Sequence, residues 1–199
     1  MILYGAKILK SAFQSTTLRT AGFYTVQQNE LTSVSKLIAI CLMFIGGSPA
    51  STAGGIKTAT LGVIILLVIN YIKGKQEINI FNRRISTNAV NRAIVVISIS
   101  IFIIIMAIST LLITENLKRE NNMNLTTVDI IFEVVSAFAT VGLTLGITSK
   151  LTFAGKLVII LLMIIGRLGP ITISIALFKK HKEMKQQKAQ YPQGSIIIG

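Results

Sequence analysis

The apolar residues of this chain fall into long runs, not into the regularly spaced stripes of a soluble helix. Residues 93–113 form the clearest run. Only Ser and Thr interrupt it, and at ~1.5 Å per residue it is long enough to cross the ~30 Å hydrocarbon core of a bilayer. Two further runs are broken: residues 37–72 contain a glycine-rich stretch at 46–55, and residues 156–178 contain Gly-Arg-Leu-Gly-Pro at 166–170. We predict one regular membrane-spanning helix and two kinked or interrupted spans.

The pattern is also duplicated. Thr-Ala-Gly-Phe at 20–23 aligns with Thr-Val-Gly-Leu at 140–143, an offset of 120 positions, and Met-Phe-Ile-Gly at 43–46 aligns with Met-Ile-Ile-Gly at 163–166. Each Thr-x-Gly loop is therefore followed by a glycine that interrupts an apolar helix. Irregular backbone of this kind is tolerated at membrane depth only where it lines a cavity. The duplication favours a pore or transporter over an enzyme.

Short helical segments precede the two loops. Residues 11–19 and 128–139 are too short to span a membrane, so we predict that they are re-entrant half-helices. The second unit has a full span before it, whereas the first begins almost at Met1. A closed pore needs more than two such units around its axis. We therefore expect the chain to be the C-terminal part of a longer protein or to assemble with another chain.

The two Thr-x-Gly loops are candidates for a cation-selectivity filter. A half-helix directs the partial negative charge of its C-terminus, about −0.5 of an elementary charge, at the space beyond it. Glycine lets the backbone turn carbonyl oxygens inward, where a ring of them can replace the hydration shell of K+. The alternative is ordinary turn chemistry, but two copies at one offset favour the filter. The candidate residues are Thr20, Ala21, Gly22, Phe23, Thr140, Val141, Gly142 and Leu143.

The longest stretch of small residues is a candidate gate. It lies between two apolar half-spans, cannot face lipid, and has few side chains to anchor it, so it could block a permeation path and withdraw from it. The competing interpretation is a phosphate-binding loop, but Ile56 separates the Gly55 and Lys57 that the Walker pattern requires to be adjacent. The candidate gating residues are Gly46, Gly47, Ser48, Pro49, Ala50, Ser51, Thr52, Ala53, Gly54 and Gly55.

Arg167 lies within the third apolar run, where an arginine costs ~2.5–3.5 kcal/mol on membrane-insertion scales and needs a partner. The offset of 120 pairs it with Gly47, so we predict that it donates hydrogen bonds to carbonyls of the 46–55 stretch. The alternative is a structural arginine that is satisfied by Gly169 or other backbone oxygens.

Composition and charge agree with a membrane protein, since 52% of the residues are hydrophobic and the mean hydropathy is +0.71. The formal net charge of +13 would suggest a nucleic-acid partner in a soluble protein, but the basic runs have almost no interleaved aromatic residues. They lie instead in the connection 73–92 and the tail 179–188, which the positive-inside rule assigns to the cytoplasm. Asp129 and Glu133 are interpreted as first-turn charges on a short helix, with attraction of external cations as the alternative.

Catalytic chemistry is not indicated. His181 is the only histidine and lies in the lysine-rich tail, and the few acids form no evident pair for acid–base work. Cys41 stands alone within an apolar run, so no disulfide framework or metal cluster is expected, and we interpret it as a small buried residue.

Five stretches together carry a resemblance. They are FQSTTLRTAGF at 13–23, the glycine-rich segment at 46–58, VSAFATVGL at 135–143, GRLGP at 166–170 and the tail YPQGSIIIG at 191–199. In these the chain resembles the Trk/Ktr/HKT superfamily of potassium transporters, and it is most similar to KtrB-type subunits. The combination is specific, and the resemblance runs over nearly the whole chain.

The resemblance implies an all-α integral membrane protein of tandem M1-P-M2 repeats with re-entrant pore loops. In the family, four such repeats surround one pore. Residues 1–73 would be the third repeat without its M1 helix, 74–92 a basic cytoplasmic loop, 93–179 the fourth repeat, and 180–199 a basic cytoplasmic tail. The 46–55 stretch would be the gating loop, and Arg167 the arginine that faces it.

The resemblance also implies a multi-pass protein of the bacterial plasma membrane that forms a homodimer and binds a cytosolic nucleotide-binding subunit of the KtrA type. Na+ is implied as a possible coupling ion, with no cofactor apart from the transported K+ and no nucleic-acid partner. We therefore expect the C-terminal half of a K+-translocating subunit. The alternative is a truncated, non-conducting membrane protein or interaction subunit that keeps the fold without a pore.

Overall fold

The structure, a computed structural model, describes residues 2–49, 51, 53–74, 79–80, 83–116 and 126–169. This part of the chain is helical apart from one short hairpin, which confirms the expected helical fold at that level. The elements are α1 (Ile2–Thr17), η1 (Gln28–Glu30), α2 (Ser33–Phe44), α3 (Thr58–Ile72), the antiparallel strands β1 (Asn79–Ile80) and β2 (Arg83–Arg84), α4 (Thr87–Asn116), α5 (Thr127–Phe138), η2 (Thr148–Lys150) and α6 (Phe153–Leu168).

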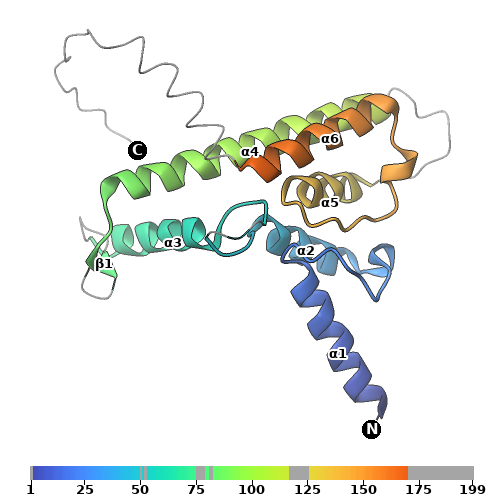
Figure 1. The fold of residues 1–199 in the computed structure, drawn as a ribbon, viewed down its shortest axis with the longest axis horizontal. Coiled ribbons are helices and arrows are strands. Elements are labelled where there is room, and N and C mark those ends of the chain that lie inside the picture. Colours follow the sequence, from blue (N-terminus) through green and yellow to red (C-terminus); the bar gives the residue numbers. More distant parts are fainter. Residues whose placement is uncertain are drawn as a thin grey trace.

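Helix α5 lies at the centre of the packed part. It contacts α2, α4 and α6, and α4 runs alongside α6 above it (Figure 1). Because α5 is enclosed by these helices, every residue from 132 to 138 is buried, and the Phe132 and Phe138 side chains are 0% exposed. In a membrane such contacts stabilise by close packing, since lipid tails are as apolar as the side chains.

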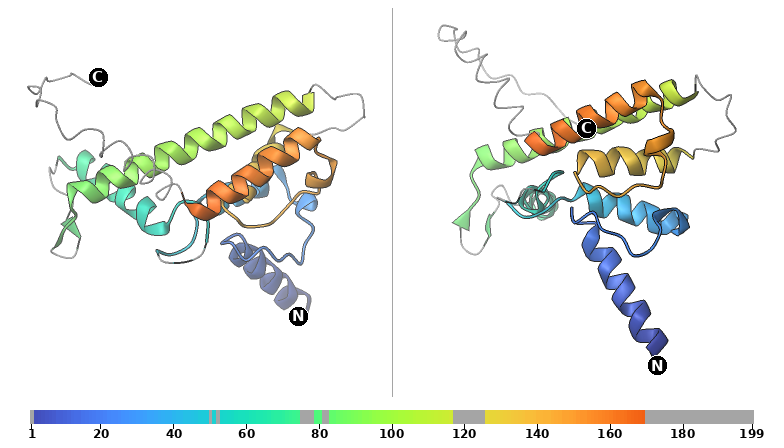
Figure 2. Two further views of the ribbon diagram at one scale, coloured as in Figure 1. Left: turned by 45° about the horizontal axis from the view of Figure 1, so that its top comes forward. Right: turned by 45° about the vertical axis from the view of Figure 1, so that its right-hand side comes forward.

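Helix α1 is the counterpart of α5 in the first unit, and it lies in a different environment. It projects away from the other helices in all three ribbon views (Figures 1 and 2), and its Ile8 and Leu9 side chains are about 70% exposed (70% and 72%). It is also longer than predicted, because it begins at Ile2 and not at residue 11. Lys7 and Lys10 interrupt the apolar pattern there, but lysine is a good helix former and continues the helix.

Helix α4 is the regular span that the sequence predicted. Within the described residues it is the one helix long and apolar enough to cross a membrane, over Thr87–Glu115. It extends beyond the predicted 93–113 at both ends, so the basic connection predicted at 74–92 ends in its first turns. Its hydroxyl residues are accommodated because Ser100, Ser109 and Thr110 each donate to the carbonyl four residues earlier, at 2.7–2.9 Å.

The interruption predicted in the 37–72 run is confirmed, whereas Gly166 lies within α6, so the interruption predicted at that glycine is wrong and the helix continues to Leu168. Helices α2 and α3 end and begin on either side of the 46–55 stretch, and α6 ends at Leu168, where Gly169 adopts a φ of 77°. The rest of the third apolar run, from Pro170, and the predicted tail at 180–199 lie outside the described residues. The start of α6 is tied to the end of α4, because the Glu115 carboxylate accepts hydrogen bonds from the Thr152 amide and hydroxyl, at 3.1 and 2.8 Å.

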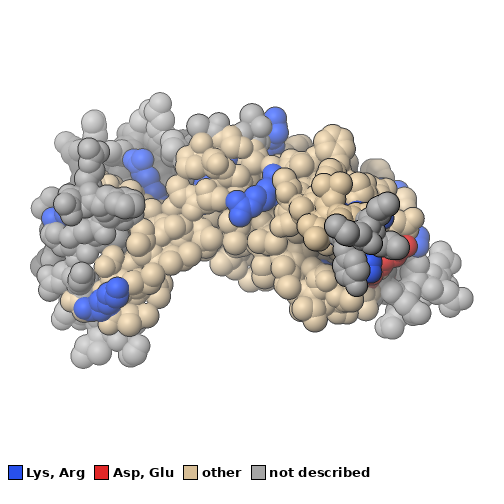
Figure 3. Space-filling model, turned by 90° about the horizontal axis from the view of Figure 1, so that it is seen from below, with Lys and Arg blue, Asp and Glu red and all other residues tan. Residues whose placement is uncertain are grey.

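The exposed surface of the long helices is largely uncharged. Figure 3 shows Lys and Arg as separate blue spots, and a small red area of Asp and Glu at one end, on a face whose other described residues are uncharged. Large apolar side chains are exposed on α4 and α6, among them Phe102 at 64% and Leu161 at 57%. Cys41 is exposed too, so the interpretation of it as a buried residue is wrong.

Candidate functional site

The two Thr-x-Gly loops have the same backbone conformation. Thr20 and Thr140 have positive φ angles, 64° and 55°. Among the described residues, no others apart from glycines have a positive φ. Gly22 and Gly142 also have positive φ angles, 78° and 86°. Positive φ is uncommon for residues other than glycine. The positive φ angles occur at matching positions, so both short helices end in the same type of turn.

A hydroxyl group of the short helix holds the end of each loop. Ser136 Oγ donates to the Leu143 carbonyl at 2.6 Å, and Thr17 Oγ1 donates to the Phe23 carbonyl. The fourth residue of each loop therefore has its carbonyl oxygen bonded to the short helix. The pattern of small residues did not indicate this contact.

The two loops also approach each other closely. A Cβ atom placed on Gly22 would lie 2.5 Å from the Val141 carbonyl oxygen, and one placed on Gly142 would lie 4.0 Å from Gly22 Cα. Residues 120 positions apart are thus neighbours in space.

The 46–55 stretch forms a closed loop at the junction of α2 and α3. The Gly46 amide donates to the Ile56 carbonyl at 2.7 Å, and the Ile56 amide donates to the Phe44 carbonyl at 3.2 Å. Lys57 Nζ donates to the carbonyls of Ser51 and Ala53 at 2.7 and 2.8 Å. The loop is therefore more strongly anchored than its composition suggested; two of its predicted residues, Ala50 and Thr52, lie outside the described residues.

The 46–55 loop contacts the second Thr-x-Gly loop directly. The Gly54 amide donates to Thr140 Oγ1 at 2.9 Å. A Cβ atom on Gly54 would lie 2.8 Å from the Ala139 carbonyl oxygen, so only glycine allows this approach. The candidate gate and one candidate filter loop are in contact.

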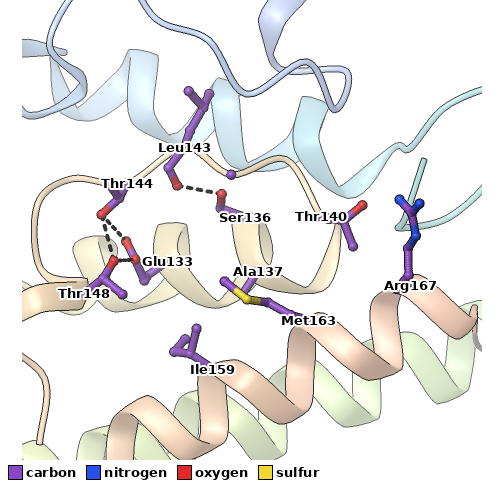
Figure 4. Close-up of a pocket in the computed structure, with 11 residues that line it drawn as sticks. Glu133, Ser136, Ala137, Thr140, Leu143, Thr144, Thr148, Ile159, Met163 and Arg167 are labelled. Carbon is purple, nitrogen blue, oxygen red and sulfur yellow. Dashed lines mark hydrogen bonds between the residues drawn. The ribbon is translucent and has the colours of Figure 1, made fainter. Parts of the chain in front are cut away.

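Arg167 lines a cavity of about 400 Å³ between α5, the second loop and α6. Figure 4 shows Arg167 and Thr140 at one end of this cavity and Glu133 at the other. Arg167 thus shares a cavity with Thr140, which in turn bonds the 46–55 loop. The hydrogen bonds predicted from Arg167 to that loop stay a prediction.

The two acids of α5 have different roles. Asp129 lies in the first turn, as predicted, and forms a capping box with Thr126. Glu133 lies in the second turn and is only 5% exposed, so its interpretation as a first-turn charge is wrong. Its carboxylate accepts hydrogen bonds from Thr144 Oγ1, at 3.0 Å, and from Thr148 Oγ1.

Asp129 also joins the two units. Lys36 Nζ on α2 lies 3.1 Å from Asp129 Oδ1, and both side chains are 16% exposed. Burial alone would raise the pKa of Asp129, but hydrogen bonds from Thr126 and Lys36 and the charge of Lys36 outweigh it, so the pKa is lowered. The sequence left Lys36 unassigned, because a contact across 93 positions has no local signal.

The glycine at position 166 allows α6 to lie against the end of α5. A Cβ atom there would lie 1.9 Å from the Phe138 carbonyl oxygen. The corresponding glycine of the first unit, Gly46, would bring its Cβ to 2.1 Å from the Gly54 carbonyl oxygen. The repeated glycine thus permits close backbone contact in both units, with the short helix in one and with the 46–55 loop in the other.

The model of the protein family described as TrkH, cation transport protein, matches residues 1–189. The chain belongs to the TrkH family. This confirms the sequence resemblance and makes the chain a membrane protein, in agreement with the apolar span of α4.

Relatives of this TrkH-family chain are potassium uptake proteins. It is 38% identical to the potassium/sodium uptake protein NtpJ of Enterococcus hirae over 193 residues, and 40% identical to the Ktr system potassium uptake protein B of Bacillus subtilis over 193 residues. A Ktr system potassium uptake protein B from Vibrio alginolyticus is 34% identical over 195 residues. These alignments cover 97–98% of the chain but only 40–42% of each relative.

Proposed function

We propose that this chain forms part of the K+ pathway of a Ktr/Trk-type uptake protein, as the C-terminal half of its ion-translocating subunit. Residues 1–73 and 93–179 act as two M1-P-M2 repeats, the first without its M1 helix. The names of the relatives and the membership of the TrkH family support the ion and the class of protein.

The close contact between the two Thr-x-Gly loops is the observation that carries the proposal. Helices α1 and α5 both end at these loops, so the negative ends of two helix dipoles lie next to the space between them. The carbonyls of residues 20–22 and 140–142 then select K+ by replacing its water. Phe23 and Leu143 act less directly, because their carbonyls are already bonded to hydroxyl groups of the short helices.

Gating is assigned to the 46–55 loop with Arg167 as its partner. The hydrogen bond from Gly54 to Thr140 supports this role, because it joins the loop to the filter. Withdrawal of the loop breaks this contact, and Lys57 keeps the loop folded as it moves. The assembly acts in a bacterial plasma membrane as a homodimer with a nucleotide-binding regulatory subunit, and Na+ is its candidate coupling ion.

Gly142→Ser tests the filter in the transport-competent assembly that contains this chain. We expect weaker preference for K+ over Na+ in competition uptake, because the side chain forces a positive-φ residue out of its conformation. Gly146→Ser is the matched control, since Gly146 has a φ of 83° in the same loop but lies beyond the filter residues. Equal selectivity in both variants would show that the filter is assigned wrongly.

Deletion of residues 50–53 tests the gate. We expect higher K+ flux, because the shortened 46–55 loop blocks the pathway less. If Arg167 holds this loop in place, Arg167→Gln should alter gating in the same direction. Unchanged or lower flux in protein that is inserted in the membrane would count against the gate. A wild-type assembly without any flux would favour the non-conducting alternative.

A further inference from the structure

A pair of hydrogen-bonded side chains fixes the segment that follows each Thr-x-Gly loop, and the two pairs differ in charge. In the second unit the pair is Glu133 on α5 and Thr148 on η2, with Thr144 as a further donor to the carboxylate (Figure 4). Thr144 Oγ1 also accepts from the Gly146 amide at 2.9 Å. The carboxylate therefore fixes the chain just after Gly142.

In the first unit the side-chain pair that joins the short helix to the 3₁₀ turn is neutral, and its helix member, Gln14, aligns with Val134 and not with Glu133. Gln28 is equivalent to Thr148 at the offset of 120, and it is 3% exposed. Its amide exchanges two hydrogen bonds with the Gln14 amide of α1, at 2.7 and 3.1 Å, and donates to the Val26 carbonyl at 2.9 Å. Two uncharged amides thus connect the short helix to the 3₁₀ turn without an acid.

The neutral pair shows that a charge is not needed to brace such a loop. An acid within an apolar protein carries a desolvation cost, and polar groups placed in membrane proteins at this cost commonly serve the ion path. Glu133 lines the same cavity as Thr140 and Gly142. Ile159 and Met163 form an apolar part of its wall, and Arg167 lies at the end opposite Glu133. A charge in such surroundings is screened little.

We propose that Glu133 is a positioning residue that also makes the second filter loop the stronger of the two cation sites. Its carboxylate fixes the segment after Gly142 through Thr144 and Thr148, and its negative charge adds to that of the α5 C-terminus behind the loop. The first loop has only its helix dipole. This inference rests on the proposed K+ pathway.

Glu133→Gln tests the role of the charge in the transport-competent assembly. A negative charge attracts all monovalent cations alike, so its loss should raise the KM for K+ and for Rb+ by the same factor, about tenfold, with Vmax changed less. A loop that is merely loosened would change the ratio of the two KM values instead. An unchanged KM, or a changed ratio without a common rise, would overturn the proposal.

The reverse change keeps the test independent of whether Glu133→Gln folds. Gln14→Glu places an acid in the neutral pair, where Gln28 Nε2 can still donate to it, and Gln14 is only partly buried. We expect the KM values for K+ and Rb+ to fall together. If neither KM value falls, this result would contradict a role for charge at this position.

Thr148→Val separates bracing from charge. It removes one donor and leaves the acid in place, so the ratio of the K+ and Rb+ KM values should change more than in Glu133→Gln. An unchanged ratio would contradict the bracing role. Wild-type uptake is measured first: failure to take up K+ overturns the proposed function itself, whereas normal wild-type uptake with an unaffected Glu133→Gln overturns only this inference.

Discussion

The short helices α1 and α5 of the two halves end in the same turn but differ in how far they are buried. Thr20 and Thr140, and likewise Gly22 and Gly142, agree in φ to within about ten degrees (64° and 55°, 78° and 86°). Yet α5 is buried along most of its length, while α1 exposes Phe13 to 39% and Ile8 and Leu9 further. The turn is therefore a local property, whereas burial depends on which helices lie nearby.

The start of the following helix is local in the same way. Thr32 caps α2 by accepting from the Ser35 amide, and Thr152 caps α6 by accepting from the Gly155 amide, at 3.3 and 3.1 Å. The 3₁₀ turns η1 and η2 precede these caps at matching positions. Short-range hydrogen bonds thus reproduce one turn, cap and helix start in two environments.

The largest expected effect tests the difference in burial. Phe138→Ala removes a 0% exposed ring from the centre of the fold and should lower the free energy of unfolding by about 3–5 kcal/mol. Phe13→Ala, on exposed α1, should change it by less than about 1 kcal/mol. Thermal unfolding of the purified protein in detergent measures both. Similar losses would show that α1 is covered by other parts of the assembly.

A smaller effect is expected from the asymmetric contact between the loops. Alanine at Gly22 meets a strained φ, which costs about 1–2 kcal/mol, and in addition a carbonyl oxygen 2.5 Å away. Alanine at Gly142 meets the strained φ but no contact closer than 4.0 Å. Gly22→Ala should therefore reduce K+ uptake about tenfold more than Gly142→Ala, an additional cost of about 1.4 kcal/mol. The reverse order would show that the loops are spaced differently in the working assembly.

The smallest effect concerns the ion pair that joins the halves. Lys36→Met should destabilise the protein by about 1 kcal/mol or less at pH 7, because the pair is only partly buried. The pKa of Asp129 is lowered in the folded state, so this stabilisation is present at pH values above the unfolded pKa and is lost as the pH falls below about 4.

The difference in unfolding temperature between wild type and Lys36→Met should therefore be smaller at pH 3.5 than at pH 7, because the stabilisation is lost as the pH falls through the lowered pKa of the folded state. Lys150→Met, at an exposed lysine on η2, is the control and should show no such pH dependence. A difference between wild type and Lys36→Met that is equal at both pH values would contradict the assigned ion pair.

The sequence predicted the features that depend on apolar runs and repeated glycines. It located α4, the interruption between α2 and α3, and the two loops, because each of these has a signal within a few residues. It misjudged the ends of α1 and α4, where lysine and threonine continue a helix outside the apolar run.

The side-chain contacts of the site could not be predicted from such signals. Lys36 with Asp129 and Gly54 with Thr140 join residues far apart in the chain, so they follow only from the packing of α2 on α5. Glu133 was assigned to the first turn although the predicted start at residue 128, one residue from the observed start, already puts it in the second turn. The 120-position offset did contain a usable signal, since it relates Gln28 to Thr148.

The backbone contact between Gly166 and Phe138 limits how this protein can move. With no side chain between them, the C-terminal ends of α5 and α6 have no room to slide or tilt independently, so the two ends must move together. Any opening motion must then use a hinge elsewhere, and the junctions of α2 and α3 with the 46–55 loop are nearby breaks in the helical structure. A small molecule that binds between α6 and α5 and separates them would therefore deform the ion path and would not reproduce its open state.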